Sequence, residues 1–306
     1  MKKNFLFIAL SVLFVGLAFS SCKKDDSGSN PNDGRIDPST IATANLIAYW
    51  GFENSPQDAV GKRGVASSAI TYPVGRRGNA LQAGPNSYIS FNLPATDPIA
   101  TMTDFTIAMW LKAPALSTTG VPCYFQLSAG DTWNGALAVY QDNNGDNTSD
   151  SLMMKAYFQK VGVTWAGQWI AQSNPSMVAD KWFHFVINYS SATSTSTIYI
   201  NGGAYKIVTT SAYGLTTRYQ DDPGDPTIAG FPNGVAPLGA LNLGLSGGNA
   251  KGVIGDWANL TVFPGVDPQD WLGHFTGQID ELRIYNKALS DQEVLDLYNA
   301  EVTQIN

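Results

Sequence analysis

The chain has 306 residues, with 18 lysines and arginines against 25 aspartates and glutamates, which gives a net charge of −7. A negative balance argues against nucleic acid or an anionic lipid surface as the partner. Only 14% of the residues are charged, against about 25% in an average globular protein. Gly, Ser, Thr and Asn are abundant in place of the missing charged residues, so we expect a neutral surface rich in hydrogen-bonding groups.

The N-terminus is predicted to be a secretory signal peptide that covers residues 1–21. Two lysines are followed by an apolar stretch at 5–19 and by two serines before Cys22, which is the order of such a signal. The apolar stretch is shorter than the ~20 residues that span a bilayer core. The site resembles the lipobox of bacterial lipoproteins, in which the cysteine is acylated, although Phe19 stands where that motif usually has an aliphatic residue. An ordinary cleaved signal that contains a cysteine is the alternative.

Residues 22–44 are predicted to comprise the lipidated Cys22 and a flexible tether. The sequence Lys23-Lys24-Asp25-Asp26 resembles the charged tag that sends some lipoproteins to the cell surface; a solvated start of a linker is the alternative. From Ser27 to Ala44 the residues are mostly small or polar and cannot form a core. We therefore expect an outer-membrane lipoprotein, exposed at the cell surface, whose membrane contact is the lipid alone.

Residues 45–306 are predicted to form one domain. No second linker or internal repeat interrupts them, and all-β sandwiches commonly reach this length. Once Cys22 is acylated, Cys123 is the only thiol left, so no intramolecular disulfide is expected. The apolar core must therefore stabilise the domain alone, and a chain of this length can bury enough surface to do so.

Strand patterns dominate this domain. Alternation of apolar residues predicts half-buried strands at Phe105–Leu111, Phe183–Tyr189 and Ile198–Ile200. The pair Asn201-Gly202, which follows the third segment, is typical of a tight hairpin. Turn-forming clusters between the strands leave no room for crossover helices. The predicted fold class is therefore all-β, a two-sheet antiparallel sandwich.

One short helix is predicted near the C-terminal end. Ser290 and Glu293 have the spacing of a capping box. The apolar stripe that follows consists of Val294, Leu295, Leu297 and Tyr298. We expect this stripe to dock on the sandwich.

Seven sequence blocks, in order, resemble the laminin G-like, concanavalin A-like jelly-roll family. They are Leu46–Glu53, Asp58–Gly61, Gly75–Leu81, Phe105–Trp110, Lys181–His184, Ile198–Gly202 and Gly277–Tyr285, the last followed by Ala288–Ser290. The blocks cover nearly the whole mature chain. The resemblance implies a jelly roll of two packed antiparallel sheets, and often a bound calcium ion. The family includes carbohydrate-binding modules, adhesive domains, and some glycoside hydrolases and lyases, so the fold does not settle the function.

Asp280 is the main candidate for a metal ligand. Strict alternation along its strand would place it on one face with Leu282 and Ile284, where an unpaired carboxylate is costly. A structural calcium ion, which prefers oxygen ligands, is one solution, and the family resemblance suggests Glu53 or Asp58 as further ligands. The alternative is that Asp280 accepts hydrogen bonds from backbone amides at the sheet edge.

A weaker calcium candidate lies in a segment rich in Asn and Asp. Four oxygen-bearing side chains follow the spacing of positions one, three, five and nine of a calcium-binding loop. They are Asp142, Asn144, Asp146 and Asp150. Position twelve is Met153 rather than the acid that the pattern requires, so a polar hairpin turn is the favoured interpretation.

Glycan binding needs an aromatic ring that stacks on a sugar, with amides or carboxylates nearby for its hydroxyls. Trp50 and Trp110 lie in alternating strands and are predicted to be structural. The candidates for the site lie among loop-forming residues, where such sites are built. They are Asp131, Trp133, Trp165, Trp169, Arg218, Tyr219, Asp256 and Trp257. The alternative for each ring is that it covers an edge of the core.

No catalytic residues are predicted. The chain has two histidines, His184 and His274, and His184 is expected to be a satisfied strand residue. No nucleophile elbow, zinc-protease helix or phosphate loop occurs, and no run of acids suits a retaining glycosidase. The predicted function is therefore a surface-tethered, non-catalytic glycan-binding protein. An adhesive protein that binds another protein, and a glycan hydrolase or lyase, are the alternatives.

Overall fold

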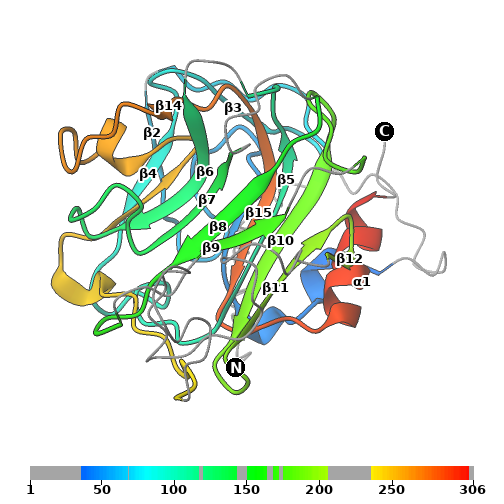
Figure 1. The fold of residues 1–306 in the computed structure, drawn as a ribbon. Helices are drawn as coiled ribbons and strands as arrows, with labels where there is room; N and C mark the ends of the chain where they lie inside the picture. The colour runs from blue at the N-terminus through cyan, green and yellow to red at the C-terminus, as the bar shows by residue number, and fades with distance from the viewer. Residues whose placement is uncertain are drawn as a thin grey trace, which may run out of the picture. The chain divides into compact units, whose positions relative to one another are not determined.

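A computed structural model describes residues 36–67, 69–116, 120–142, 150–163, 168–171, 175–205 and 236–302, with the backbone alone for 168–171. Within these ranges the chain forms two sheets (Figure 1). The first sheet has the order β1-β15-β5-β10-β11-β12, with β3 paired to β15. Its strands are β1 (Leu46–Trp50), β3 (Leu81–Ala83), β5 (Phe105–Lys112), β10 (Phe183–Ser190), β11 (Thr195–Ile200), β12 (Gly203–Tyr205) and β15 (Gly277–Tyr285).

The second sheet has the order β2-β4-β13-β6-β7-β8-β9, with β14 paired to β6. Its strands are β2 (Val65–Ala66), β4 (Ile89–Asn92), β6 (Val121–Ser128), β7 (Leu137–Gln141), β8 (Met154–Phe158), β9 (Gln168–Ala171), β13 (Lys251–Ile254) and β14 (Leu272–Gly273). The strand pairs of both sheets are antiparallel, with one exception: β14 pairs with β6 in parallel. Short 3-10 helices occur at η1 (Pro38–Thr40), η2 (Thr43–Asn45), η3 (Leu245–Gly247) and η4 (Ala258–Leu260).

The hydrophobic core contains side chains from both sheets, and the central strands contribute to it as their alternation predicts. The core-facing side chains of β5, β10 and β11 are Phe105, Ile107, Met109, Leu111, Phe183, Phe185, Ile187, Tyr189, Ile198 and Ile200. Complete burial stabilises each such side chain by about 1.5–3 kcal/mol. Trp50 is also fully buried there. The prediction of a two-sheet sandwich is therefore confirmed.

Helix α1 (Asp291–Val302) begins at the predicted capping box. The Ser290 backbone N–H donates to Glu293 Oε2 at 2.8 Å, and the Glu293 N–H donates to Ser290 Oγ at 3.3 Å. These bonds satisfy backbone donors that an uncapped helix start leaves open. The short C-terminal helix of the prediction is therefore confirmed.

Helix α1 packs on the outer face of the first sheet (Figure 1). Val294 and Leu297 are buried in a cluster with Ala108 of β5. Leu295, by contrast, is 39% exposed. Neighbouring helix residues point about 100° apart, so Leu295 cannot share the buried face with Val294. The predicted apolar stripe is wrong at that position.

Part of the predicted tether is folded. Residues 38–40 and 43–45 form the helices η1 and η2, and Ile41 between them is buried in the cluster that includes α1. An isolated apolar residue among polar ones does not stand out in composition, which explains why the tether was predicted to extend to residue 44. Within the described part of the chain, no helix is both long and apolar enough to cross a membrane.

The hairpin between β11 and β12 depends on Gly202. Asn201 has a φ of 50° and Gly202 a φ of 80°, the pair of positive values that such a two-residue turn needs. A Cβ on Gly202 would lie 2.9 Å from a ring carbon of Tyr298 in α1. Gly202→Ala is therefore expected to lower the free energy of unfolding by about 1–2 kcal/mol, because a residue with a Cβ is strained at this φ.

Urea unfolding measures this loss, and Gly203→Ala is the matched control. A Cβ on Gly203 would meet its nearest atom, the backbone oxygen of Ile200, at 3.8 Å, which is an ordinary contact. Equal unfolding free energies for the two variants would show that the hairpin does not need a glycine at position 202.

Candidate functional site

An aromatic cluster covers part of the outer face of the second sheet. At its centre Trp257 is fully buried, and its indole N–H donates to the backbone oxygen of Val121 at 2.7 Å. The centroid of this ring lies 5.3 Å from that of Tyr140, 5.8 Å from Trp133 and 6.3 Å from Trp271. Trp133 and Trp271 also meet edge to face at 4.7 Å. Such tilted pairs are favourable, so the cluster holds its rings in defined orientations.

A pocket of about 330 Å³ opens beside this cluster, and we call it the aromatic pocket. It is lined by Val121, Trp133, Tyr140, Asp142 and Trp271. Trp271 is 39% exposed, so part of its ring is available to a ligand. Asp142 forms an ion pair with Lys155 of β8. The pocket therefore combines apolar rings with charged hydrogen-bonding groups, as small-molecule sites do.

One wall of the aromatic pocket is fixed by Gln126 of β6. Its buried amide donates to the backbone oxygen of Trp133 at 2.7 Å and accepts from the backbone N–H of Ala258 at 2.6 Å. Buried amides of this kind are costly unless both ends are paired. Gln126 thus ties the loop after β6 to the start of η4, and it orients Trp133 toward the cluster.

The opposite wall is supplied by the segment that leads into β14. Asp267 accepts the backbone N–H of Trp133 at 3.0 Å. The Trp271 backbone oxygen accepts the N–H of Val121 at 2.8 Å. Next along the chain, Leu272 lies opposite Val121 where β14 pairs with β6. Main-chain hydrogen bonds therefore place Trp271 at the rim of the pocket.

The structure corrects part of the predicted glycan site. Trp133 lines the aromatic pocket, and Asp131 is exposed. Trp257 and Asp256 are fully buried and cannot contact a ligand from solution. Asp256 instead accepts the backbone N–H of Trp257 at 2.8 Å and is paired with a ring nitrogen of His274 at 2.7 Å. An Asp-Trp pair in a turn gives the same sequence pattern whether its side chains point inward or outward.

Three of the predicted residues, Trp165, Arg218 and Tyr219, lie outside the described residues. Trp169 lies in strand β9, opposite Ala156, and not in a loop as predicted. Sequence reasoning misses three residues of the pocket, Val121, Tyr140 and Trp271. Trp271 follows Pro-Gln-Asp in a polar loop, so the signal used for the other loop tryptophans would have found it. Tyr140 lies within a strand and carries no such signal.

Asp280 lies on the opposite face of β15 from the one that alternation predicts. Glu281 has a φ of 51°, and the pairing of β15 with β5 shifts between Asp280 and Arg283, which marks a β-bulge. The extra residue reverses the alternation. Asp280 is therefore opposite Trp110, whereas Leu282 is in the core. The prediction of a carboxylate on the apolar face is wrong.

Both carboxylate oxygens of Asp280 have backbone partners. Oδ2 accepts the N–H of Arg77 and Oδ1 accepts the N–H of Glu281, each at 2.8 Å. This is the capping of backbone amides that the sequence left open as the alternative. Burial, and then the neighbouring Glu281 carboxylate, raise the pKa of Asp280 to about 8.

The other two carboxylates of the predicted calcium site have partners of their own. Glu53 accepts the backbone N–H of Asn79 at 3.2 Å. Asp58 is buried and forms an ion pair with Arg63 at 3.2 Å. The described residues include no group of three His, Cys, Asp or Glu side chains placed to hold a metal ion. The argument from alternation no longer supports a calcium ion at Asp280. Calcium binding by Asp280 with Glu53 or Asp58 stays a prediction.

The second calcium candidate is described only in part. Asn144 and Asp146 lie outside the described residues. Asp142 is paired with Lys155, and the backbone oxygen of Asp150 accepts the N–H of Ala179 at 2.7 Å. The prediction for this loop stays open, and Asp142 contributes instead to the aromatic pocket.

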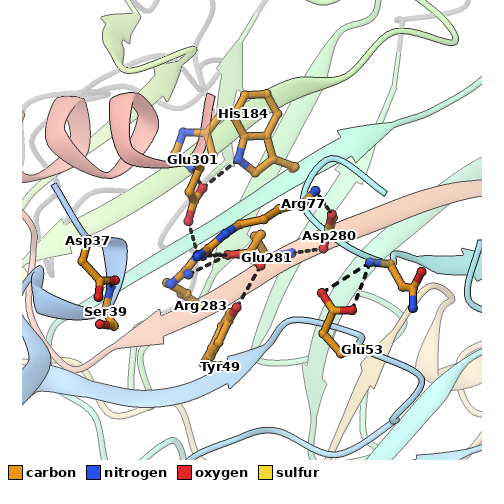
Figure 2. A network of polar contacts seen from close by, with 12 residues as sticks. Asp37, Ser39, Tyr49, Glu53, Arg77, His184, Asp280, Glu281, Arg283 and Glu301 are labelled. Carbon is orange, nitrogen blue, oxygen red and sulfur yellow. Dashed lines mark hydrogen bonds and ion pairs between the residues drawn. The ribbon is translucent and has the colours of Figure 1, made fainter. Parts of the chain in front are cut away.

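Arg283 is the centre of a buried polar network between β15 and α1 (Figure 2). Its Nη2 donates to Glu281 Oε2 at 2.6 Å, and its Nη1 donates to Glu301 of α1. The Tyr49 hydroxyl donates to Glu281 Oε1 at 2.8 Å. The Trp110 indole donates to Glu301 Oε2 at 2.7 Å, which confirms its structural role. The network lies inside the protein, so it holds α1 on the sheet and does not meet a ligand.

His184 lies against this network and differs from its prediction. Both ring nitrogens are buried and have no hydrogen-bond partner among the described residues. Nε2 is 3.8 Å from Glu301 Oε2. Burial, with Arg283 nearby, lowers the pKa of His184 to about 3. The ring is therefore neutral at neutral pH, and the prediction of a satisfied strand residue is wrong.

The raised pKa of Asp280 predicts a pH-dependent stability. The folded pKa of about 8 exceeds the ordinary value of 3.8, so the folded state binds more protons than the unfolded state between these pH values. The contribution of this carboxyl to stability is complete below pH 4 and is lost as the pH rises through 8. Burial also raises the pKa of Glu301 to about 7, which acts in the same direction.

We therefore expect the free energy of unfolding to fall between pH 5 and pH 8, by up to about 1.4 kcal/mol per pH unit for each such group. Urea unfolding at several pH values measures the slope. Asp280→Asn is expected to lower stability below about pH 5, because its amide cannot accept both backbone N–H groups, and to flatten the slope at higher pH, because the group that titrates is gone. An unchanged slope in this variant would contradict the raised pKa.

Comparison with known proteins agrees with the two-sheet fold. The model of the concanavalin A-like lectin/glucanases superfamily matches residues 83–229. No curated protein sequence matches the chain. Among solved structures, the binding domain of botulinum neurotoxin DC in complex with rat synaptotagmin II is similar at a TM-score of 0.55, with 11% identity over 86% of this chain and 52% of that one.

Two further solved structures are similar. The ligand binding domain of botulinum neurotoxin serotype D in complex with N-acetylneuraminic acid has a TM-score of 0.54 and 13% identity, over 87% of this chain and 53% of that one. Domain 4 of AbnA, a GH43 extracellular arabinanase from Geobacillus stearothermophilus, in complex with arabinotriose, has a TM-score of 0.49 and 19% identity, over 83% and 98% of the two chains. The chain spans about half the length of the toxin domains that it matches.

The likeness to the two toxin domains and the sheet order define the fold class. The fold is a concanavalin A-like jelly-roll sandwich with a short C-terminal helix. The aromatic pocket lies on the outer face of its second sheet.

Proposed function

We propose that the protein binds carbohydrate in the aromatic pocket and does not cleave it. The observation that carries this proposal is the partly exposed ring of Trp271, which is held edge to face against Trp133 at the same pocket as Asp142. The face of such a ring stacks on the apolar face of a sugar, and a carboxylate accepts hydrogen bonds from its hydroxyls. A solved domain of the same fold contains bound N-acetylneuraminic acid, which supports the proposal.

The pocket favours binding over hydrolysis. Retaining glycosidases need two carboxyl groups about 5–5.5 Å apart. Among the described residues, the aromatic pocket is lined by one carboxylate, that of Asp142, and it is engaged by Lys155. At about 330 Å³ the pocket is at the lower end of the usual size of ligand sites, about 300–1,000 Å³. A short segment or the end of a glycan chain fits that size.

Affinity gel electrophoresis tests the proposal. The folded protein is run through gels that contain one neutral polysaccharide each, and retardation in at least one gel is the expected result. Pull-down from cell envelopes tests the alternative, a protein partner. A solved toxin domain of similar fold is in complex with a protein, rat synaptotagmin II, which supports testing this alternative. No retardation in any gel, together with capture of one envelope protein, would replace the proposal by that alternative.

The location of the protein is the second part of the proposal. We infer that Cys22 is acylated and that the domain faces the outside of the outer membrane. The apolar stretch that ends at two serines and Cys22, and the charged tag at 23–26, support this inference. A lipid anchor of several acyl chains holds a protein at a membrane without help from its folded part.

Cys22→Ala is expected to move the protein from the membrane fraction to the soluble fraction, because the thiol that carries the lipid is gone. Cys123→Ala is the matched control, since the Cys123 thiol is buried, and this variant should stay with the membranes. Replacing Asp25 and Asp26 by Asn should retain the anchor but prevent surface exposure. Protease treatment of intact cells decides this point, and protection of the wild-type protein would contradict the surface location.

A further inference from the structure

A second hollow, of about 720 Å³, lies toward the other end of β6. We call it the lysine hollow. Its lining includes Asn92, Ala129, Gly130, Asn249, Lys251 and Phe263. The aromatic pocket adjoins Val121, the first residue of β6, whereas Ala129 directly follows the last. The two hollows therefore have no lining residue in common.

Strand register explains how the lysine hollow is built. Lys251 begins β13 and lies between Asn92, the last residue of β4, and Ser128, the last residue of β6. The next pair in the register is Gly252 with Phe91, and Phe91 belongs to the core. Since side chains alternate along a strand, Lys251 and Asn92 lie on the outer face of the sheet. The segments beyond these strand ends form the rim.

Lys251 is half-buried and, in the part of the chain that the structure describes, it has no acidic partner. Its ammonium donates to the amide oxygen of Asn92 at 2.8 Å, and among the described residues it forms no ion pair with Asp or Glu. Asp97, which follows the lining residues Pro94 and Ala95 in the chain, is engaged by Arg63 at 2.8 Å. An ammonium group has three donors, so donors of Lys251 remain for a ligand.

Phe263 supplies an apolar surface in the same hollow. The ring packs against Gly130, where an added Cβ would lie 2.9 Å from two ring carbons. Gly130 has a φ of 80°, a conformation that glycine adopts without strain. The glycine therefore lets the ring lie close to the backbone. Asn249 adds an exposed amide to the rim.

We propose that the lysine hollow is a second binding site, for an acidic sugar that carries a carboxylate or a sulfate group. Lys251 pairs with the anionic group, the ring of Phe263 contacts the apolar face of the sugar, and the amides of Asn92 and Asn249 bind hydroxyls. Because charge-assisted hydrogen bonds are stronger than neutral ones, the anion sets the specificity. The site does not depend on ligand binding in the aromatic pocket.

Calorimetric titration with matched oligosaccharides tests this proposal. Oligogalacturonate and its methyl ester have the same sugar chain but differ in the charge of the carboxyl group, and a sulfated galactan oligosaccharide with its desulfated form gives the corresponding comparison for sulfate. The wild-type protein is expected to bind at least one of the charged forms, and the charged form that binds identifies the anionic group. Lys251→Gln should weaken that binding about tenfold or more, and Lys251→Arg should largely restore it.

Two controls separate this site from the aromatic pocket. Phe263→Ala should weaken binding of the charged oligosaccharide, and Trp271→Ala should leave it unchanged. Absence of binding to both charged oligosaccharides would overturn the proposal. Binding that survives Lys251→Gln, or that is equal for a charged form and its neutral counterpart, would also overturn it. The neutral polysaccharides that test the aromatic pocket are different probes, so the two proposals can fail independently.

Discussion

Glu301→Ala is expected to lower the free energy of unfolding by about 3–5 kcal/mol, as the loss of one partner from a buried ion pair does. The substitution removes the acceptor of Arg283 Nη1 and of the Trp110 indole N–H. Both donors are buried, so water cannot replace the lost carboxylate. For a domain of this size the melting temperature should fall by roughly 6–20 °C.

Two variants make this prediction specific. Glu301→Gln retains an acceptor for the Trp110 indole but loses the negative charge, so it should destabilise the domain less than Glu301→Ala. Gln292→Ala removes an exposed side chain of the same helix, which bonds Asp296 at 2.8 Å, and should change the free energy of unfolding by less than about 0.5 kcal/mol. Thermal unfolding of Glu301→Ala within 2 °C of the Gln292→Ala control would show that the network does not hold α1 in place.

Local signals in the sequence predict much of this fold. Alternation identifies the core faces of β5 and β10, and Asn201-Gly202 identifies the hairpin between β11 and β12. The capping box at Ser290 identifies the start of α1. Each of these features depends on residues that are close in the chain, which is why a pattern of a few letters is enough.

Alternation fails at Glu281 because a β-bulge adds one residue to the strand. The sequence Gln278–Leu282 contains no signal for a bulge, because the residue with positive φ is a glutamate and not a glycine. The bulge is stabilised by partners far away in the chain, Tyr49 and Arg77, which hold the Glu281 carboxylate at 2.8 Å and 3.4 Å. The bulge therefore places Asp280 on the face opposite the core, so alternation gave the wrong premise for the calcium prediction at this residue.

The candidate site was predictable only in part, for a related reason. Trp133 and Trp257 lie in similar polar segments, yet Trp133 lines the pocket and Trp257 is the centre of the buried cluster. Which ring is buried depends on Gln126 and on the parallel pairing of β14 with β6. These contacts join distant parts of the chain, so no local pattern distinguishes the two tryptophans.

Trp271→Ala is expected to weaken glycan binding about 10- to 100-fold. The substitution removes the most exposed ring of the aromatic pocket, and anchor aromatics at binding sites commonly contribute about 1.4–3 kcal/mol. The ring contacts Trp133 and Trp257 from the rim, and part of its surface is in solvent. Its loss should therefore cost much less stability than the loss of a core residue, and the folded domain should remain available for binding measurements.

Calorimetric titration of three proteins with a neutral polysaccharide that retards the wild type tests the central claim most directly. These proteins are the wild type, Trp271→Ala and the control Phe263→Ala, which removes a ring from the lysine hollow. Carbohydrate binding in the aromatic pocket predicts a 10- to 100-fold weaker affinity for Trp271→Ala and an unchanged affinity for Phe263→Ala, with all three proteins folded. Equal affinity of Trp271→Ala and the wild type would contradict the claim that the aromatic pocket is the glycan-binding site.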